Sequence, residues 1–244
     1  FRYLGAQRKS LFVSLIGIFS LLGVSIGVFA LVVALAAVNG FEEEVTAQMI
    51  GKDAHVDVLS YDGEPFGAYE ELISEVKKAD STVVAVAPYL VYKMGISSRK
   101  VNDGVVIYGI DPERSKQVVD IHQKIRWGHY SVDSLPDMGG TLRPGVILGI
   151  GLANRLRVVV GDKIVLQTFQ SPDAMLASGG PKMMQAVVSG IFETGMYEYD
   201  ANLVYVGIPE MQKLLGIGDK VTGLQIRVKD FWKASETVTK LSES

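Results

Sequence analysis

Few stretches of this sequence combine residue types that could perform chemistry. Gly149-Ile150-Gly151-Leu152-Ala153-Asn154 begins like the glycine-rich loop that binds the phosphates of a dinucleotide. However, Asn154 stands where the third glycine belongs, and no strand–helix–strand unit precedes the motif. The pattern therefore carries little weight as a cofactor signal, and we expect no cofactor in this chain.

A second candidate is a carboxylate cluster formed by Glu193, Glu198 and Asp200, which lies beside Tyr197 and Tyr199. Carboxyl groups held close to one another could perform general acid–base catalysis. A carboxylate-rich loop between two strands is the commoner explanation of such a pattern. We therefore predict a loop here and assign no catalytic residue.

Metal and nucleophile signals are weak. His55, His122 and His129 are scattered along the chain, and there is no cysteine, so disulfides, thiolate metal sites and a cysteine nucleophile are excluded. The formal net charge of −3 is not that of a nucleic-acid-binding protein. The sequence predicts no metal site, no nucleic-acid partner and no enzyme.

The segment Ser171–Met184 is unusual because it joins two predicted strands yet is rich in apolar and methionine side chains. Its notable members are Pro172, Met175, Leu176, Pro181, Lys182 and Met183. Exposed methionine surfaces adapt to partners, so a docking site is one interpretation. The other is a loop that folds back onto its own domain, and both stay open.

Leu11–Val38 is a run of 28 residues without a charge, preceded by Arg8 and Lys9 and followed by Glu42–Glu44. At about 1.5 Å of rise per residue, a helix of this length crosses a hydrocarbon core of roughly 30 Å. Positive charge stays on the cytoplasmic side, which predicts a cytoplasmic N-terminus and an exported remainder. A cleaved secretory signal is the alternative, but its apolar stretch covers only about 7–15 residues.

Small residues mark one side of this predicted helix. Gly23 and Gly27 are four residues apart, a spacing that lets another helix approach closely. We therefore expect the helix to pack against other helices. Beyond the membrane it is predicted to continue as an amphipathic stalk that ends near Gly51.

Strands and helices interleave after the stalk, which predicts an α+β domain. The expected helices are Phe66–Ala79, Arg114–Gln123, Pro209–Leu215 and a closing helix from Phe231; the expected strands are His55–Val58, Thr82–Val91, Lys163–Gln170, Gln185–Phe192, Leu203–Val206 and Val221–Val228. Gly95–Ile110 is predicted as a hairpin with its turn at Asn102-Asp103-Gly104, Trp127–Gly140 as a turn-rich loop, and Gly145–Leu156 as a strand passing into a helix.

These elements predict two parts. Residues 1–52 form the cytoplasmic stub, transmembrane helix and stalk, and residues 53–244 form one exported domain. Within it we expect a βαβ-type core of about 53–111 and 201–244, with an inserted β-rich subdomain of about 112–200.

Four stretches of the sequence carry a family resemblance. They are Asn39-Gly40-Phe41-Glu42-Glu43-Glu44 with Gly51 and His55-Val56; Tyr108-Gly109-Ile110-Asp111-Pro112; Gly149–Leu156 leading into Val160-Gly161-Asp162-Lys163-Ile164; and Gly190–Asp200. Together they resemble the amino-terminal half of LolC/LolE-type lipoprotein-releasing ABC transporter permeases, which share a MacB-like periplasmic domain and an FtsX-like permease architecture. The resemblance spans essentially the whole chain.

The resemblance implies a non-catalytic permease subunit in the inner membrane with a periplasmic main domain. Its implied partners are a cytoplasmic ATPase subunit, which would bind ATP-Mg, a second permease subunit, and a lipoprotein substrate. Lipoproteins in this family leave the membrane along the first helix, at positions matching Ala34, Ala37, Val38 and Phe41. A periplasmic carrier docks on a loop that matches Ser171–Met184, although Ala177–Gly180 replace that family's usual tip.

The family continues beyond its exported domain with three more membrane helices, so we expect this chain to be a fragment that does not transport alone. Two alternatives stay open. One is a MacB-like permease for another substrate. The other is a single-span receptor with an exported binding domain.

Overall fold

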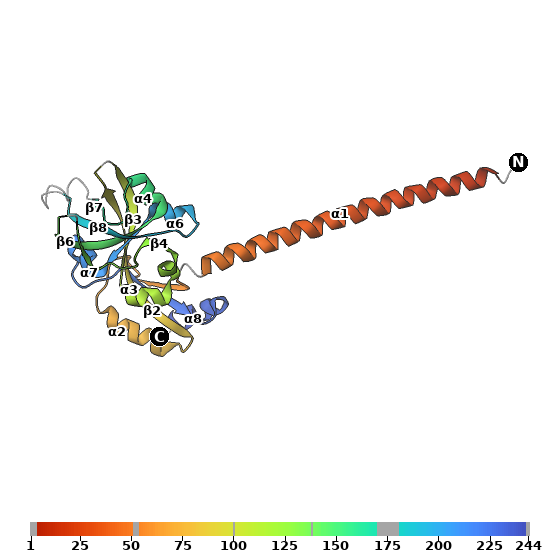
Figure 1. Cartoon of the computed structure of the whole chain (residues 1–244). Helices are drawn as coiled ribbons and strands as arrows, with labels where there is room; N and C mark the ends of the chain where they lie inside the picture. Colours follow the sequence, from red (N-terminus) through yellow and green to blue (C-terminus); the bar gives the residue numbers. More distant parts are fainter. Residues whose placement is uncertain (1–3, 51–53, 100, 138, 170–180, 243–244) are drawn as a thin grey trace. The chain divides into compact units, whose positions relative to one another are not determined.

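The computed structural model describes residues 4–50, 54–99, 101–137, 139–169 and 181–242 (Figure 1). The chain divides into two compact units, Phe1–Met49 and Ile50–Ser244. We call them the helical unit and the globular unit and describe each by itself.

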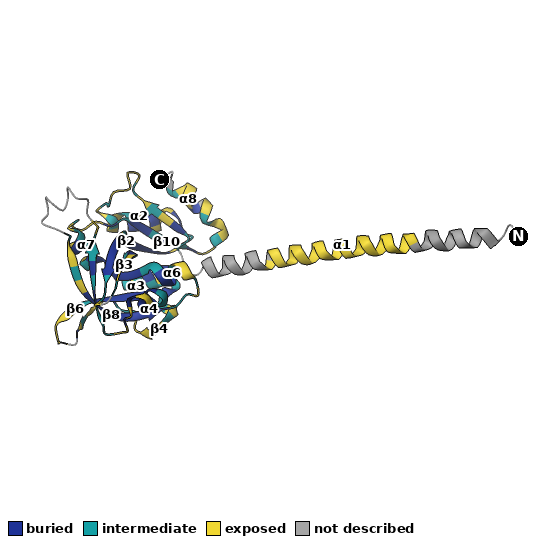
Figure 2. Cartoon of the chain, turned by 90° about the horizontal axis from the view of Figure 1, so that it is seen from above, coloured by how far each residue is buried: buried dark blue, intermediate teal, exposed yellow. Residues whose placement is uncertain are grey.

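The helical unit is one continuous helix, α1 (Leu4–Ile50). Within it, Ile16–Val38 is a stretch of 23 residues that is long and apolar enough to cross a membrane, and none of it is buried by protein (Figure 2). Large side chains such as Phe29, which is 70% exposed, would be costly to leave in water. The predicted apolar N-terminal helix is confirmed.

The globular unit is a mixed α+β structure. Its strands are β1 (Val56–Leu59), β2 (Val83–Ser97), β3 (Asn102–Ile110), β4 (Ile125–Gly128), β5 (Ser134–Pro136), β6 (Leu142–Gly149), β7 (Lys163–Thr168), β8 (Met183–Phe192), β9 (Leu203–Gly207) and β10 (Gly223–Val228). Its helices are α2 (Tyr69–Ala79), α3 (Pro112–Val118), α4 (Ile150–Leu156), α6 (Tyr197–Asn202), α7 (Ile208–Leu215) and α8 (Ala234–Ser242), with 3₁₀ turns η1 (Asp120–Lys124) and η2 (Phe231–Lys233).

Part of the sheet closes on itself. The strand order is β1-β10-β2-β3-β9-β6-β8-β4, and β7 pairs with both β2 and β8. The ring β2-β3-β9-β6-β8-β7 is therefore a closed barrel, which we call the barrel. Alternate residues of its strands point inward, and Leu90, Ile107 and Val204 are fully buried there.

The remaining sheet carries both ends of the globular unit. Strands β1 and β10 and helices α2 and α8 share a separate apolar cluster with the first half of β2, and we call this part the terminal module. Val56, near the start of the globular unit, and Leu241, near its described end, both belong to that cluster. Figures 1 and 2 show α2 and α8 side by side.

Strand β2 connects the two parts. Val83–Tyr89 of β2 pair with β10, whereas Met94–Ser97 pair with β7 on the same edge. The other edge of β2 pairs with β3 from Tyr89 to Ser97. One continuous strand thus belongs to both the terminal module and the barrel.

Several predicted elements are confirmed, and some boundaries are wrong. The predicted turn at Asn102-Asp103-Gly104 lies inside β3, because the chain turns earlier, at Ser98–Val101. The Ser98 hydroxyl accepts a hydrogen bond from the Val101 N–H and donates one to the Leu156 carbonyl, which fixes the turn there. The hydrogen bonds of the Ser98 side chain therefore decide where the chain turns, and the Asn-Asp-Gly sequence does not.

Other boundaries also differ. The predicted turn-rich loop from Trp127 to Gly140 contains the end of β4 and all of β5. The helix predicted from Phe66 begins at Tyr69, because Phe66 makes a β-bridge with Val221 instead. The helix predicted over Arg114–Gln123 is two short pieces, α3 and η1.

The start of helix α3 explains the structural role of Gly109-Ile110-Asp111-Pro112. Asp111 accepts hydrogen bonds from the N–H groups of Glu113 and Arg114 at 3.0 and 3.2 Å, and Pro112 occupies the first helical turn. A Cβ on Gly109 would lie 2.9 Å from the Met211 sulfur and 3.1 Å from Leu90 Cβ, so glycine fits this position.

We predict that Asp111→Ala destabilises the globular unit by about 1 kcal/mol, because the two capped N–H groups lose their acceptor. Urea unfolding of the detergent-solubilised chain, followed by circular dichroism, measures this. Asp111→Asn, which keeps the acceptor oxygen, is the matched control and should lose only a fraction of that stability. Equal losses in the two variants would contradict the capping role.

Candidate functional site

The apolar part of α1 and the residues just after it present one continuous stripe. Because successive helical residues are about 100° apart, Gly23, Gly27, Ala34, Val38 and Phe41 fall on the same side of this unbroken helix. Ala34, Ala37 and Val38 are exposed in the helical unit, and Phe41 lies in α1 with its side chain outside the described residues. An added Cβ on Gly23 or Gly27 would meet no atom within 4 Å. The predicted packing and lipoprotein-facing positions therefore share one stripe.

Strands β7 and β8 form the base of the predicted docking loop. They pair in antiparallel register from Lys163↔Val187 to Gln167↔Met183. Pro172, Met175 and Leu176 lie outside the described residues. Met183 is 61% exposed at the hairpin's end, so an apolar side chain does stand at the base of the loop.

Lys182 is fixed at this base. Its backbone N–H donates to the Thr168 hydroxyl, and the Lys182 carbonyl accepts from the Thr168 N–H. Its ammonium donates to the Leu215 carbonyl at 2.9 Å, at the C-terminal end of α7. A cation is favoured at that end of a helix. Lys182 thus anchors the loop to α7.

A buried carboxylate organises the other end of the hairpin. The Asp137 side chain is 1% exposed, and its carboxylate pairs with Arg143 Nε at 2.6 Å and with Lys163 Nζ at 2.8 Å. The N–H groups of Gly139 and Thr141 also donate to it. Lys163, followed by Arg143, holds the pKa of the Asp137 carboxyl well below its usual range. The cluster joins the β5–β6 turn to the first residue of β7.

Asp80 plays a similar part in the terminal module. Its carboxylate accepts from the Thr82 N–H and from the Thr237 hydroxyl, each at 2.9 Å, and Lys240 lies 3.5 Å away. The Thr82 N–H contributes most to lowering the pKa of Asp80 to about 2. Asp80 thereby ties the end of α2 to α8.

We predict that this link weakens in acid. Because the pKa of Asp80 is lower in the folded chain than the ordinary value of 3.8, its stabilisation is complete above about pH 4 and is lost as the pH falls toward 2. Asp80→Asn should therefore be less stable than the parent at pH 7, with the gap closing between pH 4 and 2. Urea midpoints measured across this range test the prediction, and a constant gap would contradict it.

The carboxylate cluster near Tyr197 is not the predicted loop, because residues 197–202 form α6. Asp200 is buried and accepts from the N–H groups of Thr194 and Gly195, so it shapes the turn that precedes the helix. Glu193 instead pairs with Arg126 at 2.8 Å. The three carboxylates therefore have separate surroundings, and nothing in this arrangement poises them as an acid–base pair.

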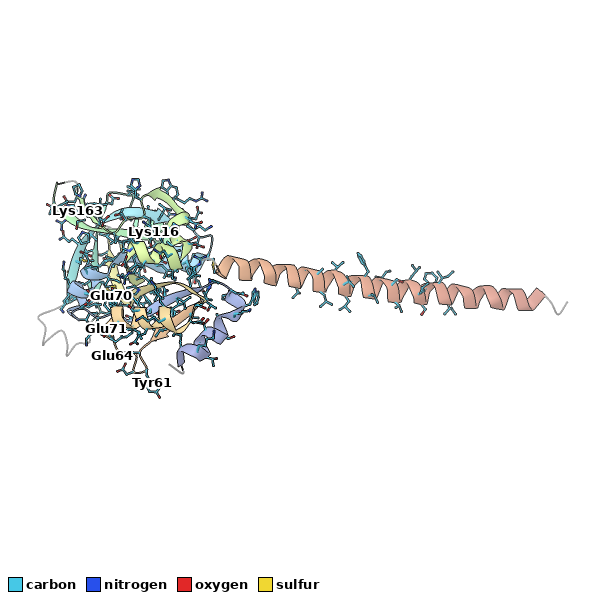
Figure 3. The ribbon with its side chains drawn as sticks, turned by 90° about the horizontal axis from the view of Figure 1, so that it is seen from below. Tyr61, Glu64, Glu70, Glu71, Lys116 and Lys163 are labelled. Carbon is cyan, nitrogen blue, oxygen red and sulfur yellow. The ribbon has the colours of Figure 1, made fainter. Side chains whose placement is uncertain are left out.

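An open cleft of about 570 Å³ lies between α2 and α7. On its α2 side, the Tyr69 hydroxyl donates to Asp219 at 2.9 Å, and Arg114 donates two hydrogen bonds to Glu70 at 2.7 and 3.0 Å. Burial and the Asp219 contact raise the pKa of Tyr69 to about 12. The Arg114–Glu70 hydrogen bonds link α2 to α3, and the Tyr69–Asp219 hydrogen bond links α2 to the chain before β10. Figure 3 labels Glu70 on α2, and it also labels Lys163.

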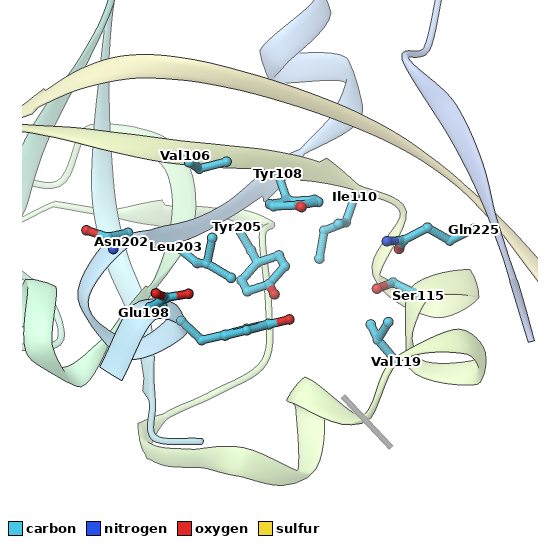
Figure 4. A pocket seen from close by; sticks show the side chains of 11 residues that line it. Val106, Tyr108, Ile110, Ser115, Val119, Glu198, Asn202, Leu203, Tyr205 and Gln225 are labelled. Atoms are coloured by element: carbon cyan, nitrogen blue, oxygen red, sulfur yellow. The ribbon is translucent and has the colours of Figure 1, made fainter. Parts of the chain in front are cut away.

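A pocket of about 340 Å³ opens on the outer surface of β3 and β9 (Figure 4). Residues Tyr108 and Tyr205 form its floor, and their ring centroids are 5.8 Å apart. Glu198 and Tyr199 of α6 and Gln225 of β10 also line it. Sequence reasoning missed this pocket, because its residues come from distant segments.

The part of the chain that the structure describes contains no group of three or more His, Cys, Asp or Glu side chains placed to hold a metal ion. His55 Nδ1 lies 3.1 Å from the Val228 carbonyl, and His122 Nδ1 lies 3.3 Å from the Val119 carbonyl. Each of these two rings thus lies against a backbone carbonyl, as expected for a histidine with a structural role.

Comparisons with known proteins agree with this architecture. A family model described as the MacB-like periplasmic core domain matches residues 18–243. The chain is 31% identical over 244 residues to the lipoprotein-releasing system transmembrane protein LolC of Xylella fastidiosa, covering 99% of this chain and 56% of that protein. It is 30% identical to LolC of Neisseria meningitidis serogroup B, covering 94% and 53%, and 24% identical to LolE of Haemophilus influenzae, covering 96% and 55%. The chain thus spans just over half the length of these relatives.

Two solved structures are similar in fold. One is the extracellular domain of the noncanonic ABC-type transporter YknZ from Gram-positive bacteria, with a TM-score of 0.50 and 14% identity over 77% of this chain and 91% of that one. The other is the periplasmic region of MacB from Actinobacillus actinomycetemcomitans, with a TM-score of 0.50 and 10% identity over 77% and 79%. At such identities the likeness shows the fold alone, and it confirms the predicted α+β fold class.

Proposed function

The chain belongs to the family of MacB-like periplasmic core domains and is homologous to LolC and LolE over nearly its whole length, and we propose that it is part of an ABC permease that releases lipoproteins from the inner membrane. The observation that carries the proposal is one unbroken apolar helix joined to a globular unit of this family. In the proposal α1 crosses the inner membrane with its N-terminus in the cytoplasm. A partner subunit supplies the ATPase, a second permease subunit completes the transporter, and this chain performs no bond chemistry.

The stripe on α1 supports a role in substrate passage. Gly23 and Gly27 would let another helix approach closely, while Ala34, Ala37, Val38 and Phe41 continue the stripe or flank it toward the periplasmic side. Pulling acyl chains out of lipid costs about 0.8 kcal/mol per CH₂, so release requires the free energy of ATP. The small side chains of this surface, Gly23, Gly27, Ala34 and Ala37, leave room for an acyl chain beside the helix.

The globular unit offers a physical route for force. Its first strand, β1, and its last described helix, α8, belong to the apolar cluster of the terminal module, so a pull on either one acts on β1, β10 and α8 together. Backbone hydrogen bonds continue from β10 to β2 and from β2 to β7, which leads to the predicted docking loop. The contacts of α2 with Arg114 and Asp219 are a second link. We infer that this route transmits movement of the stalk to the loop.

The loop that β7 and β8 present is the proposed docking site for a periplasmic lipoprotein carrier. Lys182 fixes one of its flanks to α7, and Met183 places an exposed apolar side chain beside it. A fixed base that carries an exposed methionine suits a transient partner.

Depletion of the full-length protein in the cells that make it tests the proposed function. Lipoproteins destined for the outer membrane should accumulate in the inner membrane, and an ATPase subunit should copurify with the tagged protein. Normal lipoprotein localisation together with a bound ATPase would favour a MacB-like permease for another substrate. Purification without an ATPase would favour a single-span receptor.

Photo-cross-linking tests the stripe itself. A photoreactive residue at Val38 should capture acylated lipoprotein several-fold more than one at Ala36, which lies at the same depth on nearly the opposite side of α1. Equal capture at both positions would overturn the assignment of this face.

A further inference from the structure

The pocket on the outer surface of β3 and β9 has a chemistry of its own, independent of lipoprotein release. We propose that it binds a small alkylammonium group, such as a choline or ethanolamine moiety, between its tyrosine rings and the Glu198 carboxylate.

The floor of the pocket is aromatic because of strand alternation. Ile107 and Val204 point into the barrel, so their neighbours Tyr108 and Tyr205 point outward. The two tyrosines are direct partners in the parallel pairing of β3 and β9. Their rings lie 5.8 Å apart, and Tyr89 stacks on the far side of Tyr108 at 6.0 Å. The result is a row of three rings, and Figure 4 shows two of them, Tyr108 and Tyr205, in the pocket.

The neighbouring elements leave this row partly uncovered. Ser115 and Val119, in α3 and just after it, line one side of the pocket, and residues of α6 line another. Its volume of about 340 Å³ is larger than a choline molecule needs and falls within the usual range for small-ligand pockets. Tyr205 is 7% exposed and lines the pocket.

Charge selects the ligand. Among the described residues that line the pocket, Glu198 of α6 is the only charged one, and it is exposed to solvent. The negative faces of aromatic rings attract cations, and quaternary ammonium groups are commonly recognised by such aromatic cages. A carboxylate at the rim adds attraction for a cation and repels an anion. On the opposite side the neutral amide of Gln225 lines the pocket, and the neighbouring cation, Arg227, is paired with Asp120 at 3.0 Å.

A matched pair of probes tests the proposal on the full chain in lipid nanodiscs. Choline and 3,3-dimethyl-1-butanol have nearly the same shape, but only choline carries a positive charge. We expect choline to bind at least about tenfold more tightly than the neutral alcohol, as measured by ligand-observed NMR. Equal binding of the two probes, or no choline binding at millimolar concentrations, would overturn the proposal.

Substitutions locate the site. Glu198→Gln removes the rim charge from an exposed position and should weaken choline binding about tenfold, whereas Glu75→Gln, on the exposed side of α2, should leave it unchanged. Tyr199→Leu keeps bulk but removes a ring and should also weaken binding. Circular dichroism checks that each variant is folded. Unchanged choline binding in folded Glu198→Gln would sink the assignment.

The lipid composition of the nanodiscs distinguishes two sources of the ammonium group, a lipid headgroup and a free cation. Choline affinity that is lower in phosphatidylethanolamine nanodiscs than in phosphatidylglycerol nanodiscs would identify a headgroup as the competing ligand. Equal affinity in the two would identify a free cation. Both results support an ammonium site, and neither depends on whether the chain takes part in lipoprotein release.

Discussion

Asp137→Asn is expected to lower the Tm of the globular unit by about 10 °C. The parent carboxylate is 1% exposed and satisfies two cations and two backbone N–H groups. Asparagine has the same shape, but its amide carries no charge and turns N–H donors toward groups that are themselves donors. Removing one partner of a buried ion pair is among the more destabilising single changes in proteins. Thermal loss of β-sheet circular dichroism in detergent, where α1 stays helical, measures it.

The control for this prediction is an ion pair on the surface. Arg126 and Glu193 are 2.8 Å apart, but their side chains are 62% and 38% exposed. Glu193→Gln should therefore shift the Tm by less than about 3 °C. Similar Tm shifts in the two variants would show that the buried ion pairs of Asp137 stabilise the fold no more than a surface ion pair does.

Acidity gives an independent check. Because the folded chain holds the pKa of Asp137 below its ordinary value, the stabilisation is complete above about pH 4 and declines at lower pH. The Tm difference between the parent and Asp137→Asn should therefore narrow as the pH falls below 4. A difference that widened in acid would contradict the assigned charge state.

Patterns along the chain predicted the elements well where burial has a simple period. Alternation indicated strands at Lys163–Gln170 and Gln185–Phe192, and both are confirmed within a few residues. The strands predicted at Leu203–Val206 and Val221–Val228 are confirmed as well. The uncharged run from Leu11 predicted α1. The resemblance to the LolC/LolE type is also confirmed, because the family model matches residues 18–243 and the identity to LolC extends over nearly the whole chain.

Local patterns failed where distant residues decide the structure. Closure of the barrel depends on β7 pairing with both β2 and β8, which no local period indicates. Asp137 lies in a turn-rich stretch, and its partner Lys163 is 26 residues further along, so nothing nearby marked it as buried. Tyr108 and Tyr205 form a pocket only because β3 and β9 become neighbours. The predicted division into core and inserted subdomain, and the assigned site residues, remain predictions.

The glycine pattern that imitates a dinucleotide loop has a packing explanation. Gly149 ends β6 and Gly151 lies in the first turn of α4, directly against the backbone of Asp200 and Ala201 in α6. A Cβ on Gly149 would overlap the Asp200 carbonyl oxygen and lie 2.7 Å from its carbonyl carbon. A Cβ on Gly151 would lie 3.0 Å from the same oxygen. The glycines are needed so that two backbones can approach, which requires no ligand.

Gly149→Ala is therefore expected to destabilise the globular unit by about 3 kcal/mol. The overlapping atoms belong to backbone and not to a flexible side chain, so relief requires α6 or the end of β6 to move. Gly104→Ala is the matched control: Gly104 also lies in a strand, but a Cβ there would meet nothing within 4 Å. It should be neutral or slightly stabilising, because alanine loses less backbone entropy than glycine. The urea unfolding midpoints of the two variants test this prediction. Equal midpoints would mean that the backbones of β6 and α6 do not lie as close together as the glycine pattern implies.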